Sequence, residues 1–197
     1  MTYRLGLTGS IGMGKTTTAQ MFADQGVPVW DADATVRRLY APNGQGAQLV
    51  AQIYPDVIQD GAVSRTRLRR KIAANPAALA DLEKRIHPLV AADRVAFLAA
   101  TDAEIVVLDI PLLFETHAQD QCDGIVVVSA PADVQRKRVL ARAEMTVAEF
   151  EVIRACQMPD AEKRRLATWV IETLTFDLAR AAVLAIIVEI RQRIANA

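Results

Sequence analysis

The chain has 197 residues, of which 52% are hydrophobic, 23% charged and 5% aromatic, and this composition predicts one globular domain. Lysine and arginine together number 23, as do aspartate and glutamate, so the composition gives no overall basic excess to attract nucleic acid. The two cysteines, Cys122 and Cys156, lack CxxC spacing and indicate buried or incidental thiols. The longest uncharged apolar run, Ala181–Val188, is too short to cross a bilayer, and glycines come too early at the N-terminus for a signal peptide. We therefore expect a soluble cytoplasmic protein, monomeric or weakly self-associating, with no nucleic-acid or membrane partner.

The first half of the chain begins with alternating apolar and helical patterns, which are typical of an α/β fold with a parallel sheet. These patterns predict a strand at 3–8, a helix at 16–25 and a short strand at 27–30. Residues 34–100 are helical in pattern, apart from a turn-rich break near 54–61. Apolar residues at helical spacing predict one buried face there: Leu79, Leu82, Ile86, Leu89 and Val90.

The second half returns to the α/β pattern. Two nearly continuous Val, Ile and Leu runs predict buried strands at 105–108 and 124–129, followed by a helix at 131–142. Residues 145–165 are polar, helical and charged, and a last strand at 169–172 precedes a helix from 177 onward. The order predicts a parallel core of four or five strands flanked by helices, in one domain spanning 1–197. The core takes residues 1–33, 101–142 and 167–197, with a helical insert at 34–100 and a small lid at 143–166, and such inserts surround the ligand crevice.

A phosphate-binding loop lies between the first strand and the first helix. Its sequence GSIGMGKT, residues 9–16, fits G-x-x-x-x-G-K-[ST]. Glycines let successive backbone N–H groups point at a phosphate, and the helix N-terminus adds partial positive charge. Lys15 supplies a catalytic cation to the β- and γ-phosphates, and the Thr16 hydroxyl can bind Mg²⁺. We therefore expect ATP to be bound by Gly9, Ser10, Ile11, Gly12, Met13, Gly14, Lys15, Thr16 and Thr17.

Asp109 is a second candidate ligand for Mg²⁺, because it closes the predicted strand IVVLD. A carboxylate at the end of a neighbouring strand can bind the ion directly or through water, as a Walker B aspartate does. The alternative is that Asp109 only caps the segment that follows.

The chain favours a kinase over a GTPase switch, because none of its three asparagines begins an N-K-x-D motif. Asp31 and Asp33 instead follow the second strand. A carboxylate there can accept the proton of a substrate hydroxyl as it attacks the γ-phosphorus, and Asp33 is our candidate for this base. Asp31 is the better candidate for shaping the strand end or binding the ion. The alternative is that the pair provides a helix N-cap and a surface charge.

The charged segments before the last strand fit a lid. Gln135, Arg138 and Arg142 share one helical face, and Lys163–Arg165 form a second cationic cluster. Arginines that close over a transferred phosphoryl group stabilise its charge and exclude water, and Arg142 is the candidate for this catalytic role. The alternative is a solvated helix face.

Four stretches of the chain resemble dephospho-coenzyme A kinases, and the resemblance runs from about residue 4 to residue 172. They are LGLTGSIGMGKTT around the phosphate loop, DAD at 31–33, SRTRL with LEKRIHP in the insert, and DIPLLFE at 109–115 with Gln135 and Arg138 behind it. The phosphate loop is generic and a DxD also occurs in shikimate kinases, whereas the His-Pro and PLLFE elements are far more specific.

The resemblance implies a P-loop kinase fold and transfer of the ATP γ-phosphoryl group to the ribose 3′-hydroxyl of dephospho-coenzyme A. It implies that Asp33 is the base, that the insert with Arg65 and His87 grips the acceptor, and that the segment around Arg142 is the ATP lid. Arg65 suits the acceptor's pyrophosphate, and Pro88 biases His87 away from helical geometry. An apolar wall beside the acceptor is expected from Pro111, Leu112 and Leu113, with ordinary core packing as the alternative.

One stretch departs from the family pattern. Thr168, Thr173 and Thr175 stand where the family has Asp, Asn and Gly near the last strand, so adenine contacts and the preference for ATP over GTP can differ. Two rivals remain open at this point. The first is another small-molecule kinase of the same fold, and the second is a nucleotide-dependent switch without phosphoryl transfer.

Overall fold

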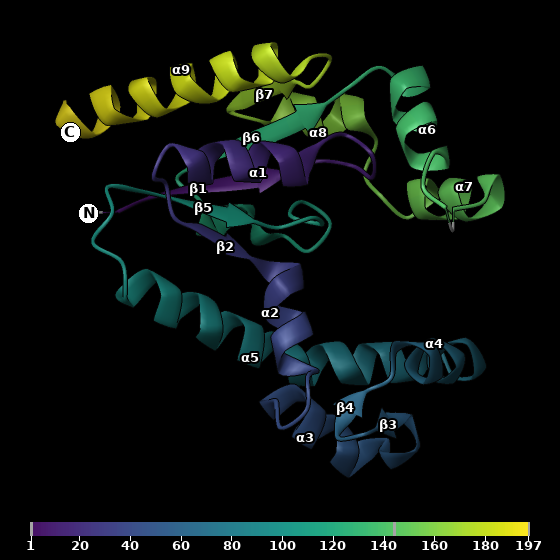
Figure 1. The fold of residues 1–197 in the computed structure, drawn as a ribbon. Coiled ribbons are helices and arrows are strands. Elements are labelled where there is room, and N and C mark those ends of the chain that lie inside the picture. The colour runs from purple at the N-terminus through teal and green to yellow at the C-terminus, as the bar shows by residue number, and fades with distance from the viewer. Residues whose placement is uncertain (1, 144, 197) are drawn as a thin grey trace. The chain divides into compact units, whose positions relative to one another are not determined.

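The structure, a computed structural model, describes residues 2–143 and 145–196 (Figure 1). It divides into two compact units, which we call the sheet unit (Met1–Trp30 and Asp102–Ala197) and the helical unit (Asp31–Thr101). Among the described residues, no helix has the length and apolar content needed to cross a membrane.

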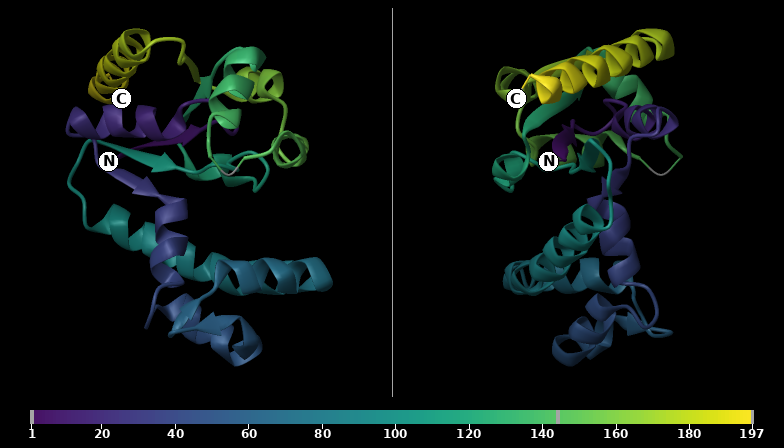
Figure 2. Two further views of the ribbon diagram at one scale, coloured as in Figure 1. Left: turned by 45° about the vertical axis from the view of Figure 1, so that its right-hand side comes forward. Right: turned by 90° about the vertical axis from the view of Figure 1, so that its left-hand side faces the viewer.

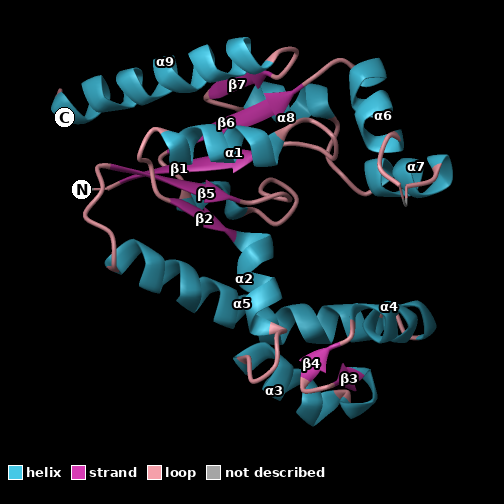
Figure 3. Cartoon of the chain, viewed as in Figure 1, coloured by secondary structure: helices cyan, strands magenta, loops and turns pink. Residues whose placement is uncertain are grey.

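The sheet unit is built on five strands: β1 (Tyr3–Thr8), β2 (Val29–Asp31), β5 (Ile105–Asp109), β6 (Gly124–Ser129) and β7 (Trp169–Glu172). Their order is β2-β5-β1-β6-β7 (Figure 3), and the pairs β1–β5, β1–β6 and β6–β7 are parallel. β1, β6 and β7 have the predicted bounds. β2 starts two residues later than predicted, because the N–H of Val27 donates to Phe22 O and still closes the preceding helix.

Helices α1 (Lys15–Asp24) and α9 (Phe176–Ala195) pack against one face of this sheet (Figure 2). Every residue of β5 and β6 is buried, as their continuous apolar sequences predict. The core on this face joins strand residues such as Leu7 and Val126 to Phe22 of α1 and Ile187 of α9. Full burial of one such side chain stabilises the fold by about 1.5–3 kcal/mol.

Three helices and a short turn complete the sheet unit. The turn η2 spans Ala118–Gln121, and α6 (Ala132–Leu140), α7 (Val147–Ala155) and α8 (Asp160–Leu166) follow β6. Thr146 caps α7 through a capping box with Glu149. The predicted helical segment 145–165 is therefore two helices, since Pro159 fits the start of α8 but not a helix interior.

The helical unit contains α2 (Ala32–Leu39), α3 (Gln45–Ile53), η1 (Pro55–Val57), α4 (Arg65–Ala74) and α5 (Ala77–Ala99). Its core includes Val50, Leu82 and Ile86, with Leu89 and Val90 packed at the edge. The predicted apolar face of α5 is therefore largely confirmed, but Leu79 is 44% exposed. A polar contact also ties α2 to α5, because the Thr35 hydroxyl donates to Asp93 at 2.9 Å.

The turn-rich break in the helical unit is a small antiparallel hairpin, which the sequence analysis did not identify. Strands β3 (Ile58–Gln59) and β4 (Ala62–Val63) are joined by Asp60 and Gly61. Both loop residues have positive φ, 51° and 78°. An Asp-Gly pair is a strong hairpin signal, so the hairpin could have been predicted from the sequence.

The geometry expected for His87 is wrong. Although Pro88 follows it, His87 lies inside the continuous helix α5 with an exposed side chain. Pro88 disfavours a helical residue before it but does not forbid one. The apolar packing of Leu82 and Ile86 on the same helix outweighs that local bias.

Candidate nucleotide site and catalytic residues

The phosphate loop between β1 and α1 has a backbone that only glycine fits at two points. Gly12 and Gly14 have φ of 78° and 93°. A Cβ on Gly12 would lie 2.4 Å from Val139 Cγ2. Close packing against α6 therefore also excludes any side chain at this position. The loop thus requires glycine at positions 12 and 14, where the backbone is left-handed.

At the end of the loop, the first residues of α1 have backbone N–H groups without a helical partner. This helix begins at Lys15 without a side-chain cap, and the first helical N–H bond runs from Thr18 to Gly14 O at 3.1 Å. The N–H groups of Lys15, Thr16 and Thr17 have no intrahelical partner at a helix start. Together with the helix dipole they form an anion site of the kind that binds phosphate.

Lys15 and Asp109 form an ion pair at this place. Lys15 Nζ lies 2.5 Å from Asp109 Oδ1, with the two side chains 16% and 5% exposed. The strand register brings them together, because Asp109 at the end of β5 pairs with Leu7 of β1 just before the loop. The side chain of Thr16, the other predicted Mg²⁺ ligand, is exposed.

Two glutamine side chains hold Ile11 of the phosphate loop. Gln135 of α6 donates from Nε2 to Ile11 O at 2.8 Å, and Gln157 Oε1 accepts from Ile11 N at 3.0 Å. Gln135 lies on the helical face that its spacing predicts to be functional, whereas no sequence pattern indicates Gln157. Nothing local to residue 157 marks it, since the contact spans 146 residues.

Thr173 holds a second point of the loop. Its hydroxyl donates to Met13 O at 2.8 Å and accepts from Arg138 Nη1 at 2.9 Å. Arg138 also donates to Thr173 O. The departure from the family pattern at this position therefore falls on a residue that supports the phosphate loop.

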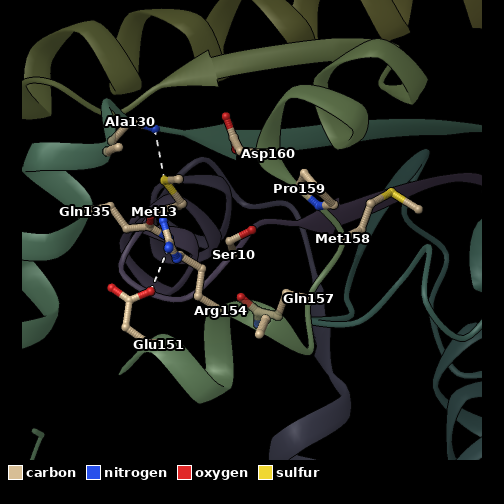
Figure 4. A pocket seen from close by; sticks show the side chains of 12 residues that line it. Ser10, Met13, Ala130, Gln135, Glu151, Arg154, Gln157, Met158, Pro159 and Asp160 are labelled. Atoms are coloured by element: carbon tan, nitrogen blue, oxygen red, sulfur yellow. Dashed lines mark hydrogen bonds and ion pairs between the residues drawn. The ribbon is translucent and has the colours of Figure 1, made fainter. Parts of the chain in front are cut away.

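A cavity of about 710 Å³ lies beside the loop (Figure 4). It is lined by Ser10, Met13, Ala130, Ala132, Gln135, Glu151, Arg154, Ala155, Gln157, Met158, Pro159 and Asp160. Arg154 of α7 pairs there with Glu151 at 2.6 Å. Arg142, the predicted lid cation, follows α6 with an exposed side chain and is not among these lining residues.

A buried ion pair joins α8 to the loop after β5. Lys163 is fully buried, and its Nζ is 2.8 Å from Glu115 Oε1, which also accepts from Met158 N at 2.8 Å. Burial raises the pKa of Glu115, but the Lys163 ammonium and the Met158 N–H outweigh it and leave that pKa below its ordinary value. The predicted cationic cluster at 163–165 is therefore only partly exposed.

The predicted acceptor wall is divided between core and surface. Leu113 is fully buried, and a Cβ on Gly6 of β1 would lie 2.8 Å from its Cδ1. The side chain of Leu112, by contrast, is 40% exposed, and that of Pro111 is half-buried. Leu113 thus packs in the core in this structure, and acceptor binding stays a prediction for Pro111 and Leu112.

The candidate residues of the helical unit are exposed. Asp31 caps α2 by accepting from Ala34 N at 2.9 Å, which agrees with the N-cap alternative for this residue. Asp33 lies in the first turn of α2, and Arg65 is the first residue of α4. Both side chains are exposed, as is that of His87.

A P-loop between the first strand and helix, on a parallel α/β sheet with a Lys15–Asp109 pair at the strand ends, defines a nucleotide-binding protein of the P-loop class. A family model described as dephospho-CoA kinase matches residues 3–175. The chain belongs to the dephospho-CoA kinase family.

Similar proteins agree with this assignment. The chain is 56% identical to the dephospho-CoA kinase of Cereibacter sphaeroides over 190 residues, 96% of each chain. It is 52% identical to that of Ruegeria pomeroyi over 191 residues, 97% of each. Among solved structures, a Thermus thermophilus protein superposes with a TM-score of 0.87 at 31% identity, covering 95% of this chain and 97% of that one.

Proposed function

We propose that this chain transfers the γ-phosphoryl group of ATP to the ribose 3′-hydroxyl of dephospho-CoA, which produces CoA. The observation that carries the proposal is the phosphate loop with Lys15 paired to Asp109, in a chain that the dephospho-CoA kinase family model matches over residues 3–175.

In this proposal the sheet unit binds the nucleotide. The residues from Gly9 to Thr17 surround the phosphates, and the N–H groups at the start of α1 are the proposed donors. The N–H of Ile11 stays bonded to Gln157 and shapes the loop. Lys15 then exchanges its contact with Asp109 for the β- and γ-phosphate oxygens. Its charge stabilises the transition state, in which negative charge spreads over the equatorial oxygens of the transferred group.

Thr16 and Asp109 are the proposed protein ligands of Mg²⁺. Their hydroxyl and carboxylate oxygens are of the type that Mg²⁺ prefers, and the ion is usually completed by phosphate oxygens and water. Residues 2–143 and 145–196 contain no group of three or more His, Cys, Asp and Glu that could hold a metal ion. When bound, the ion neutralises charge on the β- and γ-phosphates.

Acceptor-binding roles are proposed for residues of the helical unit and, separately, for two residues of the loop after β5. Asp33 accepts the proton of the 3′-hydroxyl as that oxygen attacks phosphorus, and its exposed position in the first turn of α2 leaves it available to a ligand. Arg65 pairs with the acceptor's pyrophosphate. His87 contributes a further polar contact, and Pro111 with Leu112 an apolar one. We further propose residues 34–100 as the acceptor-binding insert and 143–166 as the lid, with Arg142 as its cation.

The test is direct synthesis of CoA. Purified protein is incubated with ATP, Mg²⁺ and dephospho-CoA, and CoA is measured by mass spectrometry beside the Lys15→Ala variant. Product that requires ATP and Lys15 supports the proposal. Demonstrated ATP binding without CoA formation would overturn the acceptor assignment, and a panel of other hydroxyl acceptors would follow.

A further inference from the structure

The connection between α7 and α8, residues 156–159, is attached to two functional parts of the sheet unit. Gln157 reaches the phosphate loop at Ile11, and the N–H of the next residue, Met158, donates to Glu115 in the loop after β5. Two successive residues therefore fix this connection to two different parts of the sheet unit. Such attachments are unusual for a segment expected to move as part of a lid.

The contact at Ile11 has no substitute within the loop. The N–H and C=O of this residue are both bonded to side chains, those of Gln157 and Gln135. Met13 closes the next turn of the loop by donating to Ser10 O at 3.1 Å. Losing the Gln157 oxygen would leave the Ile11 N–H without its acceptor and free the first turn of the loop to rotate.

The ion pair behind the connection keeps Gln157 in place. Lys163 is 0% exposed and Glu115 17% exposed, so breaking their pair would leave a charge in a poorly solvated site. Because Glu115 Oε1 also accepts from Met158 N, the pair fixes the backbone one residue from Gln157. The connection is thus rigid where it meets the phosphate loop.

We propose that Gln157 is a positioning residue for the nucleotide phosphates: it holds Ile11 so that the phosphate loop keeps its binding form, and Glu115 and Lys163 hold Gln157. This inference rests on the proposed ATP site but not on the identity of the acceptor. It predicts that Gln157 sets affinity for ATP and leaves the chemical step and the acceptor affinity nearly unchanged.

The test uses Gln157→Met, which keeps the length of the side chain and removes the acceptor oxygen. Gln20→Met is the matched control, because Gln20 donates only to Asp24 on the exposed side of α1. Titration calorimetry should show about a tenfold rise in the Kd of ATP for Gln157→Met, as expected for one lost hydrogen bond. The control should stay within about twofold with an unchanged melting temperature, and Gln157→Met should melt no more than about 4 °C below the wild type.

Steady-state kinetics distinguish a loss of phosphate-loop positioning from a general disruption of the folded enzyme. Gln157→Met should raise KM for ATP about tenfold while kcat and KM for the acceptor change less than about twofold. Gln157→Asn, whose oxygen is one methylene short of Ile11, should behave in the same way. An unchanged Kd for ATP, or a fall in kcat together with melting temperature, would overturn the role of Gln157. If the wild type itself binds no ATP, the proposed function falls as well, so the two failures are distinguishable.

Discussion

In the sheet unit the candidate cation Lys15 and its partner Asp109 are enclosed and paired, whereas in the helical unit the candidate side chains Asp33, Arg65 and His87 are exposed. Lys15 and Asp109 are 16% and 5% exposed and in contact, and the phosphate loop beside them is fixed by Gln135, Gln157 and Thr173. Asp33 and Arg65 instead lie in the first turns of helices with their side chains in solvent.

This difference separates two kinds of functional residue. A buried, paired side chain is part of the folded structure, so replacing it changes both stability and activity. Replacing an exposed side chain that contacts only the substrate changes activity alone, since surface substitutions change the free energy of unfolding by less than about 0.5 kcal/mol. If the proposed roles are right, the sheet unit provides a preorganised phosphate site, and the helical unit provides groups that the acceptor itself must order.

Asp33→Asn should give the largest effect and the clearest separation of activity from stability. Loss of a general base lowers kcat by about 10²–10⁴-fold. The Kd of ATP and the melting temperature should stay at wild-type values, because the side chain is exposed in the first turn of α2. Rapid-quench assays of CoA formation and ATP titration measure the two quantities. A kcat within about threefold of wild type would remove Asp33 from the mechanism.

Lys15→Ala should lower both activity and stability. Losing one preorganised charge at the transferred phosphoryl group costs about 10²–10³-fold in kcat. The change also removes the ammonium that pairs with the buried Asp109, which should cost about 1–3 kcal/mol of unfolding free energy. Denaturant unfolding measures that loss. Asp109→Asn in the Lys15→Ala background is the control and should recover part of it, since the buried charge that has lost the Lys15 ammonium is then gone. If Lys15→Ala is as stable as the wild type, the ion pair does not stabilise the sheet unit.

Glu115→Gln tests the buried Glu115–Lys163 ion pair, to which we assign no part in phosphoryl transfer. Lys163, fully buried, would lose its counter-ion, so unfolding free energy should fall by about 3 kcal/mol. The double variant Glu115→Gln with Lys163→Met should recover much of this loss, because neither charge remains. A double variant no more stable than the single one would contradict this account.

The same pair gives a pH dependence of defined sign. The pKa of Glu115 is lowered in the folded protein, so its contribution to stability is present above the unfolded pKa, about 4.3, and is lost as pH falls through the folded value. The stability difference between wild type and Glu115→Gln should therefore be largest near neutral pH and shrink below about pH 4. Denaturant midpoints measured at several pH values check this. A difference that is constant over that range would contradict the ion pair as its cause.

The sequence predicted the parts of this molecule that depend on local pattern. Continuous apolar runs identified β5 and β6, and the G-x-x-x-x-G-K-T spacing placed the phosphate loop between strand and helix. What it could not provide were contacts between distant residues. Gln157 meets Ile11 across 146 positions and Thr173 meets Met13 across 160, and neither partner carries a signal of the other.

Local rules also failed where packing competed with them. The bias of Pro88 against a helical His87 is outweighed by the buried face of α5. Leu112 and Leu113 look alike in sequence, yet one is 40% exposed and the other fully buried, because only tertiary packing decides which faces the core.

Arg65→Ala should have the smallest effect of these variants and tests the exposed half of the comparison. One charged contact to the acceptor's pyrophosphate is worth about 1.5–3 kcal/mol, so KM for dephospho-CoA should rise about 10- to 100-fold. KM for ATP and the melting temperature should not change, because Arg65 is the exposed first residue of α4. Steady-state kinetics with each substrate varied in turn measure the effect.

The control for Arg65 is Arg67→Ala in the same helix. Arg67 donates to Ile58 O at 3.0 Å, so its loss removes a contact of the helical unit but no proposed contact to the acceptor. A rise in KM for dephospho-CoA with Arg65→Ala alone would show that α4 contributes a specific anion contact. Equal rises with both variants would mean that the charge of the helix attracts the acceptor without a particular partner. In that case the helical unit would attract its substrate through the summed electrostatic field of its charges. The phosphate loop of the sheet unit, by contrast, is positioned by individual hydrogen bonds.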